Sequence, residues 1–107
     1  MGLFDFFRNT SDINAGVAEY KTNDGAVLLD VRTAEEYSDG HIDGSVNLPL
    51  DRISFIENTI KDKNTPLYVY CYSGSRSGQA ISYLRRIGYT NATNIGGISS
   101  YRGKVMR

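Results

Sequence analysis

The sequence predicts an α/β domain of three layers, α/β/α, in which a parallel sheet lies between two layers of helices. Short apolar runs alternate along the chain with segments of helical periodicity, and the connections between them are short. The run over residues 26–31 is apolar on both faces, which is typical of a strand covered on both sides. Right-handed crossovers then place helices on both faces and leave the ligand site at the carboxyl ends of the strands.

The helices are predicted from capping residues and apolar spacing. Asp12 is placed to cap a first helix, and Asp51 to cap a third. Thr33 and Glu36 have the spacing of a capping box for a second. Gly88 is the expected C-cap of a fourth. The apolar side chains at helical spacing in the first, third and fourth helices are Ile13, Val17, Tyr20, Ile53, Ile56, Ile60, Ala80, Ile81, Leu84 and Ile87.

Strands are predicted where short apolar runs lie between turn residues. They cover residues 26–31, 46–48, 67–70 and 92–95. The two glycines at 96–97 are expected to form a tight turn. The segment from Ser99 is expected to add one helical turn.

Length and charge favour one domain over residues 1–107, with residues 1–10 as an N-terminal leader segment. Twelve Lys and Arg balance twelve Asp and Glu, so the overall charge favours neither nucleic acid nor a membrane as partner. We expect a monomer whose partner is small or locally recognised. The apolar side chains of the leader either pack on the core, which its shortness favours, or contact a membrane or a partner.

Cysteine and histidine usage limits the chemistry. The chain has one cysteine, Cys71, and one histidine, His41, so it forms no internal disulfide and lacks the ligands of a structural zinc site. We therefore expect no metal. A cysteine that reacts through its own thiolate requires no organic cofactor either, and none is expected. The apolar stretch of the leader is too short for a signal peptide and is interrupted by an acidic residue. No apolar run is long enough to span a bilayer, and the cytoplasm, where a thiol stays reduced, is therefore the expected location.

Cys71 stands where the strand over residues 67–70 ends and a loop leads into an amphipathic helix, expected to begin at Ser77. The amides of such a loop and the positive end of the helix dipole favour thiolate over thiol. Gly74 permits a positive φ, and Arg76 either binds an anionic donor or clamps loop carbonyls. The candidate substrate-binding residues are Tyr72, Ser73, Gly74, Ser75, Arg76 and Ser77, of which Tyr72, Ser73 and Ser75 shape the entrance.

Segments spread over most of the chain resemble the rhodanese family of sulfurtransferases. They are residues 28–32, 36–37, 40–49, 71–77 and 96–97. The resemblance implies a sheet of five parallel strands. It also implies that Cys71 takes sulfane sulfur from a donor such as thiosulfate, holds it as a persulfide, and passes it to a thiophilic acceptor such as cyanide or a thiol. The departures from the family pattern, Asp43, Ser45 and Tyr101, lie outside the sulfur-bearing loop.

Three polar residues near the expected site are interpreted as structural. Asp30 ends an apolar run, and a carboxylate in that position more often binds nearby amides or an arginine than acts as an acid. Arg32 is interpreted in the same way. His41 belongs to a turn over residues 40–42 that the family shares, so we expect it to tie loops together rather than to act as a base for Cys71.

Three functions stay open. The first is a sulfurtransferase that uses thiosulfate or a persulfide as donor and a thiol or cyanide as acceptor. The second is a sulfur-carrier or protein-binding module, in which Cys71 holds sulfur for a protein acceptor and has little turnover of its own. The third, a cysteine phosphatase or arsenate reductase, is disfavoured because only four residues separate Cys71 from Arg76, and a phosphoryl group needs a wider ring.

Overall fold

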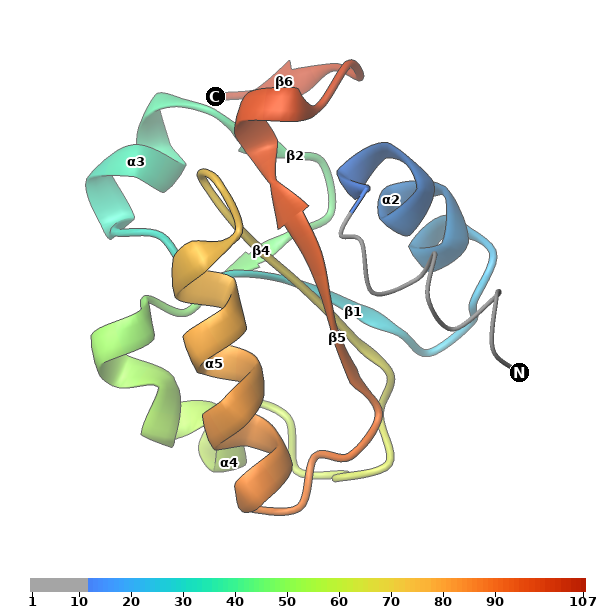
Figure 1. Ribbon diagram of the computed structural model, residues 1–107, viewed down its shortest axis with the longest axis vertical. Helices are drawn as coiled ribbons and strands as arrows, with labels where there is room; N and C mark the ends of the chain where they lie inside the picture. Colours follow the sequence, from blue (N-terminus) through green and yellow to red (C-terminus); the bar gives the residue numbers. More distant parts are fainter. Residues whose placement is uncertain (1–11) are drawn as a thin grey trace.

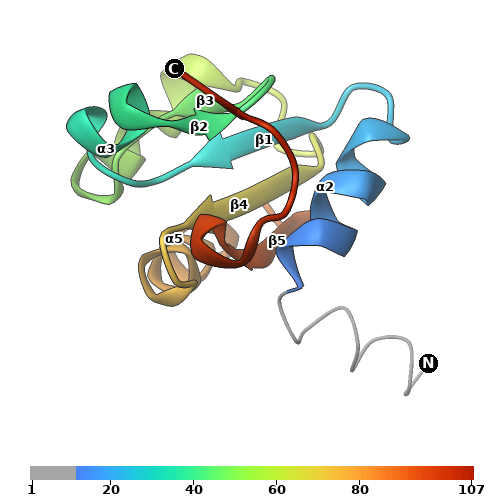
Figure 2. The same ribbon diagram turned by 90° about the horizontal axis from the view of Figure 1, so that it is seen from above.

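The computed structural model describes residues 12–107 and contains a four-stranded parallel sheet (Figure 1). The strands are β1 (Val27–Asp30), β3 (Val46–Asn47), β4 (Leu67–Cys71) and β5 (Ala92–Gly97), in the order β3-β1-β4-β5. Helix α2 (Ile13–Lys21) lies on one face of the sheet, and helices α4 (Ile56–Thr59) and α5 (Ser75–Arg86) lie on the other (Figures 1 and 2). The three-layer α/β/α architecture predicted from the sequence is confirmed.

The expected count of five parallel strands is wrong for residues 12–107. The two further strands, β2 (His41–Ile42) and β6 (Val105–Met106), pair antiparallel with each other in a separate ladder. This pair lies beyond the carboxyl end of β5 (Figure 1). One reason for the separation is that the Ile42 amide donates to the Tyr70 hydroxyl at 3.1 Å, so this N–H does not extend the main sheet.

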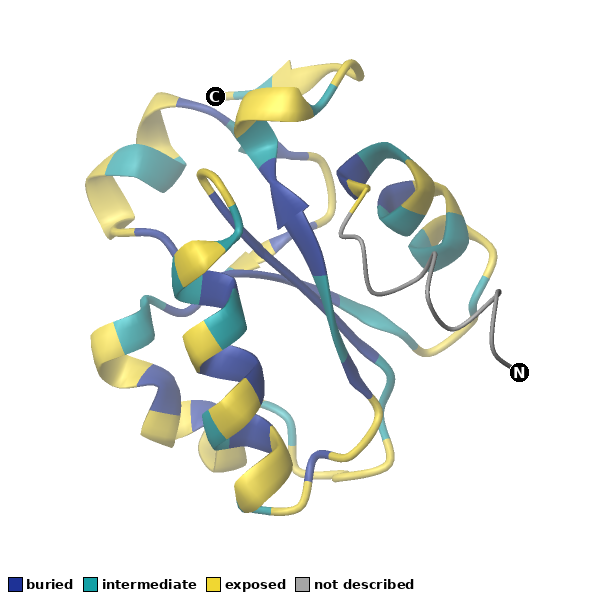
Figure 3. Ribbon diagram, viewed as in Figure 1, coloured by how far each residue is buried: buried dark blue, intermediate teal, exposed yellow. Residues whose placement is uncertain are grey.

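Alternate residues of strand β4 enter two apolar cores, one on each face of the sheet. Val69 and Cys71 belong to the core under α5, which includes Leu84, whereas Tyr68 and Tyr70 belong to the core under α2. All of β4 is buried (Figure 3). Burial of each large apolar side chain contributes about 1.5–3 kcal/mol. The alternation therefore places the Cys71 side chain on the α5 face of the sheet. The packing of β4 in both cores fixes the strand in this orientation.

Two predicted helix starts are confirmed. The Asp12 carboxylate accepts the Asn14 amide at 3.0 Å and caps α2. Thr33 and Glu36 form a reciprocal capping box at the start of helix α3 (Ala34–Asp39). Caps of this kind contribute about 1 kcal/mol each.

The predicted cap at Asp51 is wrong. The segment after β3 begins as a 3-10 helix, η1 (Leu50–Phe55), with Pro49 as its N-cap residue and no side-chain cap. The proline ring fixes φ, here −55°, and so starts the turn before Asp51 is reached. Helix α4 follows directly and ends with Ile60 as its C-cap residue.

The remaining expectations concern the end of the helix after Cys71 and the two ends of the chain. Helix α5 ends with Ile87 as its C-cap residue, and the glycine expected there, Gly88, follows it with φ of 111°. The helical turn expected near Ser99 is present as a 3-10 turn, η2 (Ile98–Ser100). The predicted leader, residues 1–10, lies outside the described residues. None of the helices within residues 12–107 is long and apolar enough to cross a bilayer.

Candidate active site at the carboxyl end of strand β4

Cys71 is the last residue of β4 and lies at the carboxyl edge of the parallel sheet. Its register partner on β5 is Gly97, which is the last residue of that strand. On the other side, the Val31 amide donates to the Tyr70 carbonyl at 3.0 Å and continues the pairing of β1 with β4 up to the cysteine. The thiol therefore stands where ligands of parallel sheets bind, outside the carboxyl ends of the strands.

The chain turns back after Cys71 so that a backbone amide points at the sulfur. Gly74 has φ of 101°, and its N–H donates to Cys71 Sγ at 2.9 Å. Helix α5 begins at Ser75, and the expected start at Ser77 is therefore wrong by two residues. The cause is the left-handed N-cap conformation of Gly74, which a glycine adopts without strain and which ends the loop early.

The environment of the Cys71 thiol favours its ionised form. Burial by itself raises the pKa of the thiol, because a thiolate is less well solvated there. Hydrogen bonds to the sulfur from the Ser77 hydroxyl, and from the amides of Ser77, Gly74 and Ser73, outweigh burial and hold the pKa of Cys71 below its ordinary value. The N-terminal end of α5, with its partial positive charge, acts in the same direction.

A buried polar network joins the Cys71 loop to strand β5. The Ser77 side chain is buried, and its Oγ lies 3.4 Å from Cys71 Sγ and 2.8 Å from Asn94 Oδ1. The Asn94 Nδ2 donates to the Gly74 carbonyl at 3.1 Å, and the Asn94 Oδ1 accepts the Gly96 amide at 2.9 Å. The Ser77 Oγ also lies 3.1 Å from the Gly74 carbonyl oxygen. Because a hydroxyl has a single proton, the sulfur of Cys71, the Asn94 oxygen and this carbonyl compete for it.

Asn94 is a site residue that the sequence analysis missed. The sequence marks it only as part of an expected strand, although a polar side chain between the apolar Ala92 and Ile95, two residues before paired glycines, is an available signal. Ser77 was named as a substrate-binding residue. Because it is fully buried, its hydroxyl contacts the sulfur from the protein side and leaves the entrance to other residues.

The tight turn expected at residues 96–97 is wrong, because both glycines belong to β5. A Cβ placed on Gly97 would overlap the backbone of Tyr72 and Ser73. The pairing of β4 with β5 shifts in register after Val69, so that Cys71 stands opposite Gly97. The absence of a side chain at Gly97 therefore allows Tyr72 and Ser73, the first residues after Cys71, to pack directly against β5.

Arg76 lies in the first turn of α5, and its side chain points to helix α3. Its Nη1 and Nη2 donate to Glu36 Oε1 and Oε2 at 2.7 and 3.0 Å. The hydrogen bond from Arg76, opposed by burial and assisted by Thr33, lowers the pKa of Glu36 to about 2. Of the two roles expected for Arg76, a clamp on loop carbonyls is not what the contacts show, since its partner is a carboxylate. The spacing of Thr33 and Glu36 predicts only the capping box, and the pairing of Glu36 with Arg76 is an additional contact.

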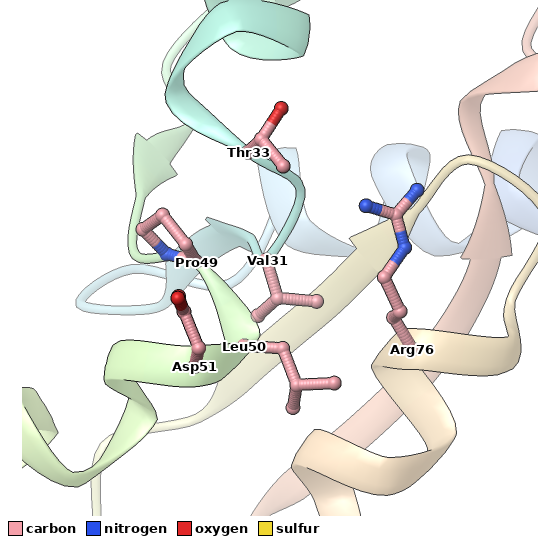
Figure 4. Close-up of a pocket in the computed structure, with 6 residues that line it drawn as sticks. All are labelled: Val31, Thr33, Pro49, Leu50, Asp51 and Arg76. Carbon is pink, nitrogen blue, oxygen red and sulfur yellow. The ribbon is translucent and has the colours of Figure 1, made fainter.

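A pocket of about 390 Å³ opens beside Arg76 at the same edge of the sheet (Figure 4). Its lining residues are Val31, Thr33, Pro49, Leu50, Asp51 and Arg76. Figure 4 shows the Arg76 guanidinium on one side of the pocket, with Pro49 and Asp51 on the other and Val31 and Leu50 between them. Val31 continues the pairing of β1 beside β4, so the pocket adjoins the strand end that carries the thiol.

Access to the sulfur is narrow. Cys71 is 1% exposed, whereas Tyr72 is 55% exposed and Ser73 and Ser75 are also exposed. Gly74, whose amide contacts the sulfur, has intermediate exposure. The Cys71 thiol thus lies directly beneath an exposed loop, and a reagent reaches it most easily through a small terminal atom.

Asp30 and Arg32 form a buried ion pair. Arg32 Nη2 donates to Asp30 Oδ2 at 2.7 Å and to the Gly40 carbonyl at 2.7 Å. The Arg32 amide also donates to Asp30 Oδ1 at 2.9 Å. These contacts join the end of β1 to the start of β2, so they support the structural interpretation of both residues.

His41 contacts helix α3. Its Nδ1 is 2.8 Å from the Tyr37 carbonyl oxygen, and its ring stacks on the Tyr37 ring with 3.8 Å between centroids. No contact of His41 with Cys71 is found in the described part of the chain. The geometry supports a role in tying loops together. Within residues 12–107, no cluster of three His, Cys, Asp or Glu side chains is arranged to hold a metal ion.

The fold and the site define an α/β domain with an amide-bound thiol at the carboxyl edge of its sheet. The chain belongs to the rhodanese-like domain family, whose model matches residues 14–104. It is 41% identical over 71 residues to thiosulfate sulfurtransferase PspE of Escherichia coli strain K12, covering 65% of this chain and 68% of that protein. A solved structure described as rhodanese with anions from E. coli superposes with a TM-score of 0.71 at 35% identity, covering 77% of this chain and 98% of the other.

A third relative is larger than this chain. The putative sulfur carrier protein YrkF of Bacillus subtilis strain 168 is 35% identical over 79 residues, which covers 73% of this chain and 42% of YrkF. The chain therefore spans less than half of that protein, and about two thirds of PspE. Both names concern sulfur, and one of them describes a carrier.

Proposed function

We propose that this protein is a sulfurtransferase that moves sulfane sulfur from a small-molecule donor to a thiophilic acceptor through a persulfide on Cys71. The observation that carries the proposal is the hydrogen bond from the Gly74 amide to Cys71 Sγ at 2.9 Å, at the start of α5. An amide aimed at sulfur favours the thiolate, which is the nucleophile, and later the anionic end of a persulfide. Membership of the family and the likeness to PspE support the same function.

In the first half-reaction, the Cys71 thiolate attacks the outer sulfur of the donor. A new S–S bond forms, and the S–S bond within the donor breaks, so that the remainder of the donor leaves with the electron pair; from thiosulfate it leaves as sulfite. The negative charge moves to the terminal sulfur of the persulfide. The loop amides from Tyr72 to Arg76 are the donors available to it.

In the second half-reaction, the acceptor attacks the terminal sulfur of the persulfide. The S–S bond breaks, cyanide leaves as thiocyanate, and Cys71 is restored as a thiolate. Because the donor remnant leaves before the acceptor reacts, the proposal implies ping-pong kinetics. The residues of this chain supply the nucleophile and the hydrogen bonds, and no step requires a cofactor.

The test is incubation with thiosulfate and cyanide, with thiocyanate as the measured product. Cys71→Ser is expected to abolish the product, and Ser82→Ala, on the exposed side of α5, is the matched control. Intact mass spectrometry after exposure to thiosulfate alone should show one added sulfur that cyanide removes. Equal thiocyanate formation by the wild type and Cys71→Ser would contradict the proposal.

A second candidate function is a sulfur carrier that delivers to a protein acceptor. It is favoured by the likeness to YrkF, whose name describes a putative carrier. The persulfide chemistry is the same, and only the acceptor differs. The two functions separate when loss of the Cys71 persulfide is followed with cyanide, small thiols and candidate proteins in parallel. Fast loss only to a protein would support the carrier.

Phosphatase or arsenate reductase activity has weaker support. Four residues separate Cys71 from Arg76, and the Arg76 guanidinium is bound to both oxygens of Glu36 rather than facing the thiol as a free anion ligand. Turnover of an aryl phosphate that is lost in Cys71→Ser would reverse this ranking.

A further inference from the structure

We propose that the preferred sulfur donor carries one negative charge and an uncharged organic group, that this group occupies the pocket beside Arg76, and that Glu36 sets the preference against thiosulfate. Thiosulfonates and organic persulfides are donors of this class. The inference rests on the sulfurtransferase function proposed above and names the substrate class of the same site.

The pocket offers an apolar floor to such a group. Val31, Pro49 and Leu50 contribute aliphatic surface, and the space beside them is about 390 Å³ (Figure 4). Pockets of this size with apolar walls and a few polar groups are typical of small-molecule sites. Thiosulfate has no carbon atoms and gains nothing from this surface. A donor with an organic group removes that group from water here.

The charges around the pocket do not favour a dianion. One positive side chain, Arg76, faces two negative ones, since Asp51 lies across the pocket and Glu36 binds the guanidinium through both of its oxygens. This forked pair uses two of the five N–H groups of the guanidinium and neutralises its charge, so Arg76 attracts a second anion less strongly than an unpaired arginine would.

The loop amides do not discriminate between the two classes of donor. Thiosulfate and a thiosulfonate both present one anionic terminal sulfur to Cys71, and the Gly74 amide and the start of α5 favour either. Thiosulfate differs in the second negative charge on its sulfonate oxygens. That charge lies away from the loop and meets the mixed charges of the pocket, so the preference arises there.

The chemistry balances without an added oxidant or reductant. The Cys71 thiolate attacks the terminal sulfur of the thiosulfonate, and a new S–S bond forms. The bond between the terminal sulfur and the sulfonyl sulfur breaks, and a sulfinate leaves with the electron pair. The thiolate and the thiosulfonate each carry one negative charge before the step. The persulfide and the sulfinate each carry one after it, so the total charge is unchanged.

The first test compares benzenethiosulfonate with thiosulfate, using cyanide as the common acceptor and the full chain. The expected wild-type kcat/KM is about tenfold or more higher for benzenethiosulfonate, because a buried aromatic ring contributes on the order of that factor. A wild-type kcat/KM for thiosulfate equal to or above that for benzenethiosulfonate would overturn the inference. Absence of thiocyanate with both donors, and of any added sulfur on Cys71, would instead overturn the proposed function.

The second test changes Glu36. Glu36→Gln keeps a residue that suits a capping box but removes the charge that neutralises Arg76. The kcat/KM ratio of benzenethiosulfonate to thiosulfate should fall about fivefold, mainly through a lower KM for thiosulfate. Glu35→Gln is the matched control. Glu35 is exposed in the same helical turn, and the ion pair of Arg76 in the described part of the chain is with Glu36. The same ratio in both variants would contradict the role of Glu36.

The third test changes the floor of the pocket. Leu50→Ala removes aliphatic surface, so benzenethiosulfonate should lose more kcat/KM than thiosulfate, and the ratio should fall about fivefold. Comparing two donors on one protein sample cancels any loss of folded enzyme. An unchanged ratio in Leu50→Ala would show that the organic group does not bind in this pocket.

Discussion

Two arginine–carboxylate pairs stand near the same edge of the sheet and have similar forked geometry, but they differ in burial. The side chains of Arg32 and Asp30 are 6% and 0% exposed, and those of Arg76 and Glu36 are 34% and 33% exposed. Each pair has a shortest distance of 2.7 Å. The comparison shows that geometry alone does not define what a pair does. Removing one partner of a buried pair leaves an unpaired buried charge, whereas an exposed pair contributes little stability.

The two pairs therefore have different roles at this edge of the sheet. Asp30 and Arg32 hold the ends of β1 and β2 together, and Glu36 with Arg76 sets the charge of the pocket beside Cys71. The first pair should matter for folding and the second for donor choice.

The largest effect is expected for Asp30→Asn. It leaves the Arg32 guanidinium buried without a carboxylate, so the free energy of unfolding should fall by about 3–5 kcal/mol. The measurement is urea-induced unfolding. Asp39→Asn, at an exposed position of α3, is the control and should change stability by less than about 0.5 kcal/mol. A loss for Asp30→Asn no larger than that of Glu36→Gln would remove the distinction between the two pairs.

Asn94→Ala tests whether the polar network around Cys71 contributes to stability, as the buried pair of Asp30 and Arg32 does. It leaves the Gly96 amide without its side-chain acceptor and removes one of the donors to the Gly74 carbonyl, which should lower the free energy of unfolding by about 1–3 kcal/mol. Persulfide formation should also slow, because the loop loses the side-chain hydrogen bond that joins its Gly74 carbonyl to β5. Asn91→Ala removes one exposed hydrogen bond and serves as control. Unchanged stability and rate would show that β5 does not position the loop.

Ser77→Ala should act on the reactivity of the thiol more than on folding. Without the Ser77 hydroxyl the pKa of Cys71 rises, since one hydrogen bond to the thiolate is lost. The rate of alkylation by iodoacetamide below that pKa should fall about tenfold, and the pH profile should move to higher pH. Ser82→Ala, on the exposed side of the same helix, should leave the profile in place.

The smallest effect is expected from acid titration of Glu36. Its pKa in the folded protein is about 2, below its ordinary value of 4.5, so its ion pair stabilises the folded state above pH 4.5. This contribution, less than about 1 kcal/mol because the pair is partly exposed, is lost as pH falls from 4.5 towards 2. The difference in unfolding free energy between wild type and Glu36→Gln should shrink over that range. A difference that grows on acidification would contradict the assignment.

Features set by neighbouring residues could be predicted from the sequence. The Asp12 cap, the capping box at Thr33 and the alternation of buried strands with helices depend on short spacings, and the α/β/α layers follow from them. The position of Cys71 at a strand end before a glycine and a helix is of the same kind.

Features set by distant residues could not be predicted in this way. Arg76 and Glu36 are separated by 40 residues, and Asn94 meets Ser77 across 17. Their contacts depend on how β1, β4 and β5 lie side by side, which spacing does not reveal. The same applies to the pairing of β2 with β6, which reduced the expected five parallel strands to four.

The burial of Cys71 has a consequence for its survival between turnovers. A stabilised thiolate is oxidised easily when it is exposed, and it forms mixed disulfides with other thiols. At 1% exposure, this thiol is shielded from bulky disulfides such as oxidised glutathione, although a terminal sulfur atom is small enough to approach it. The fold therefore covers the sulfur of Cys71 while the hydrogen bonds around it hold its pKa below the ordinary value.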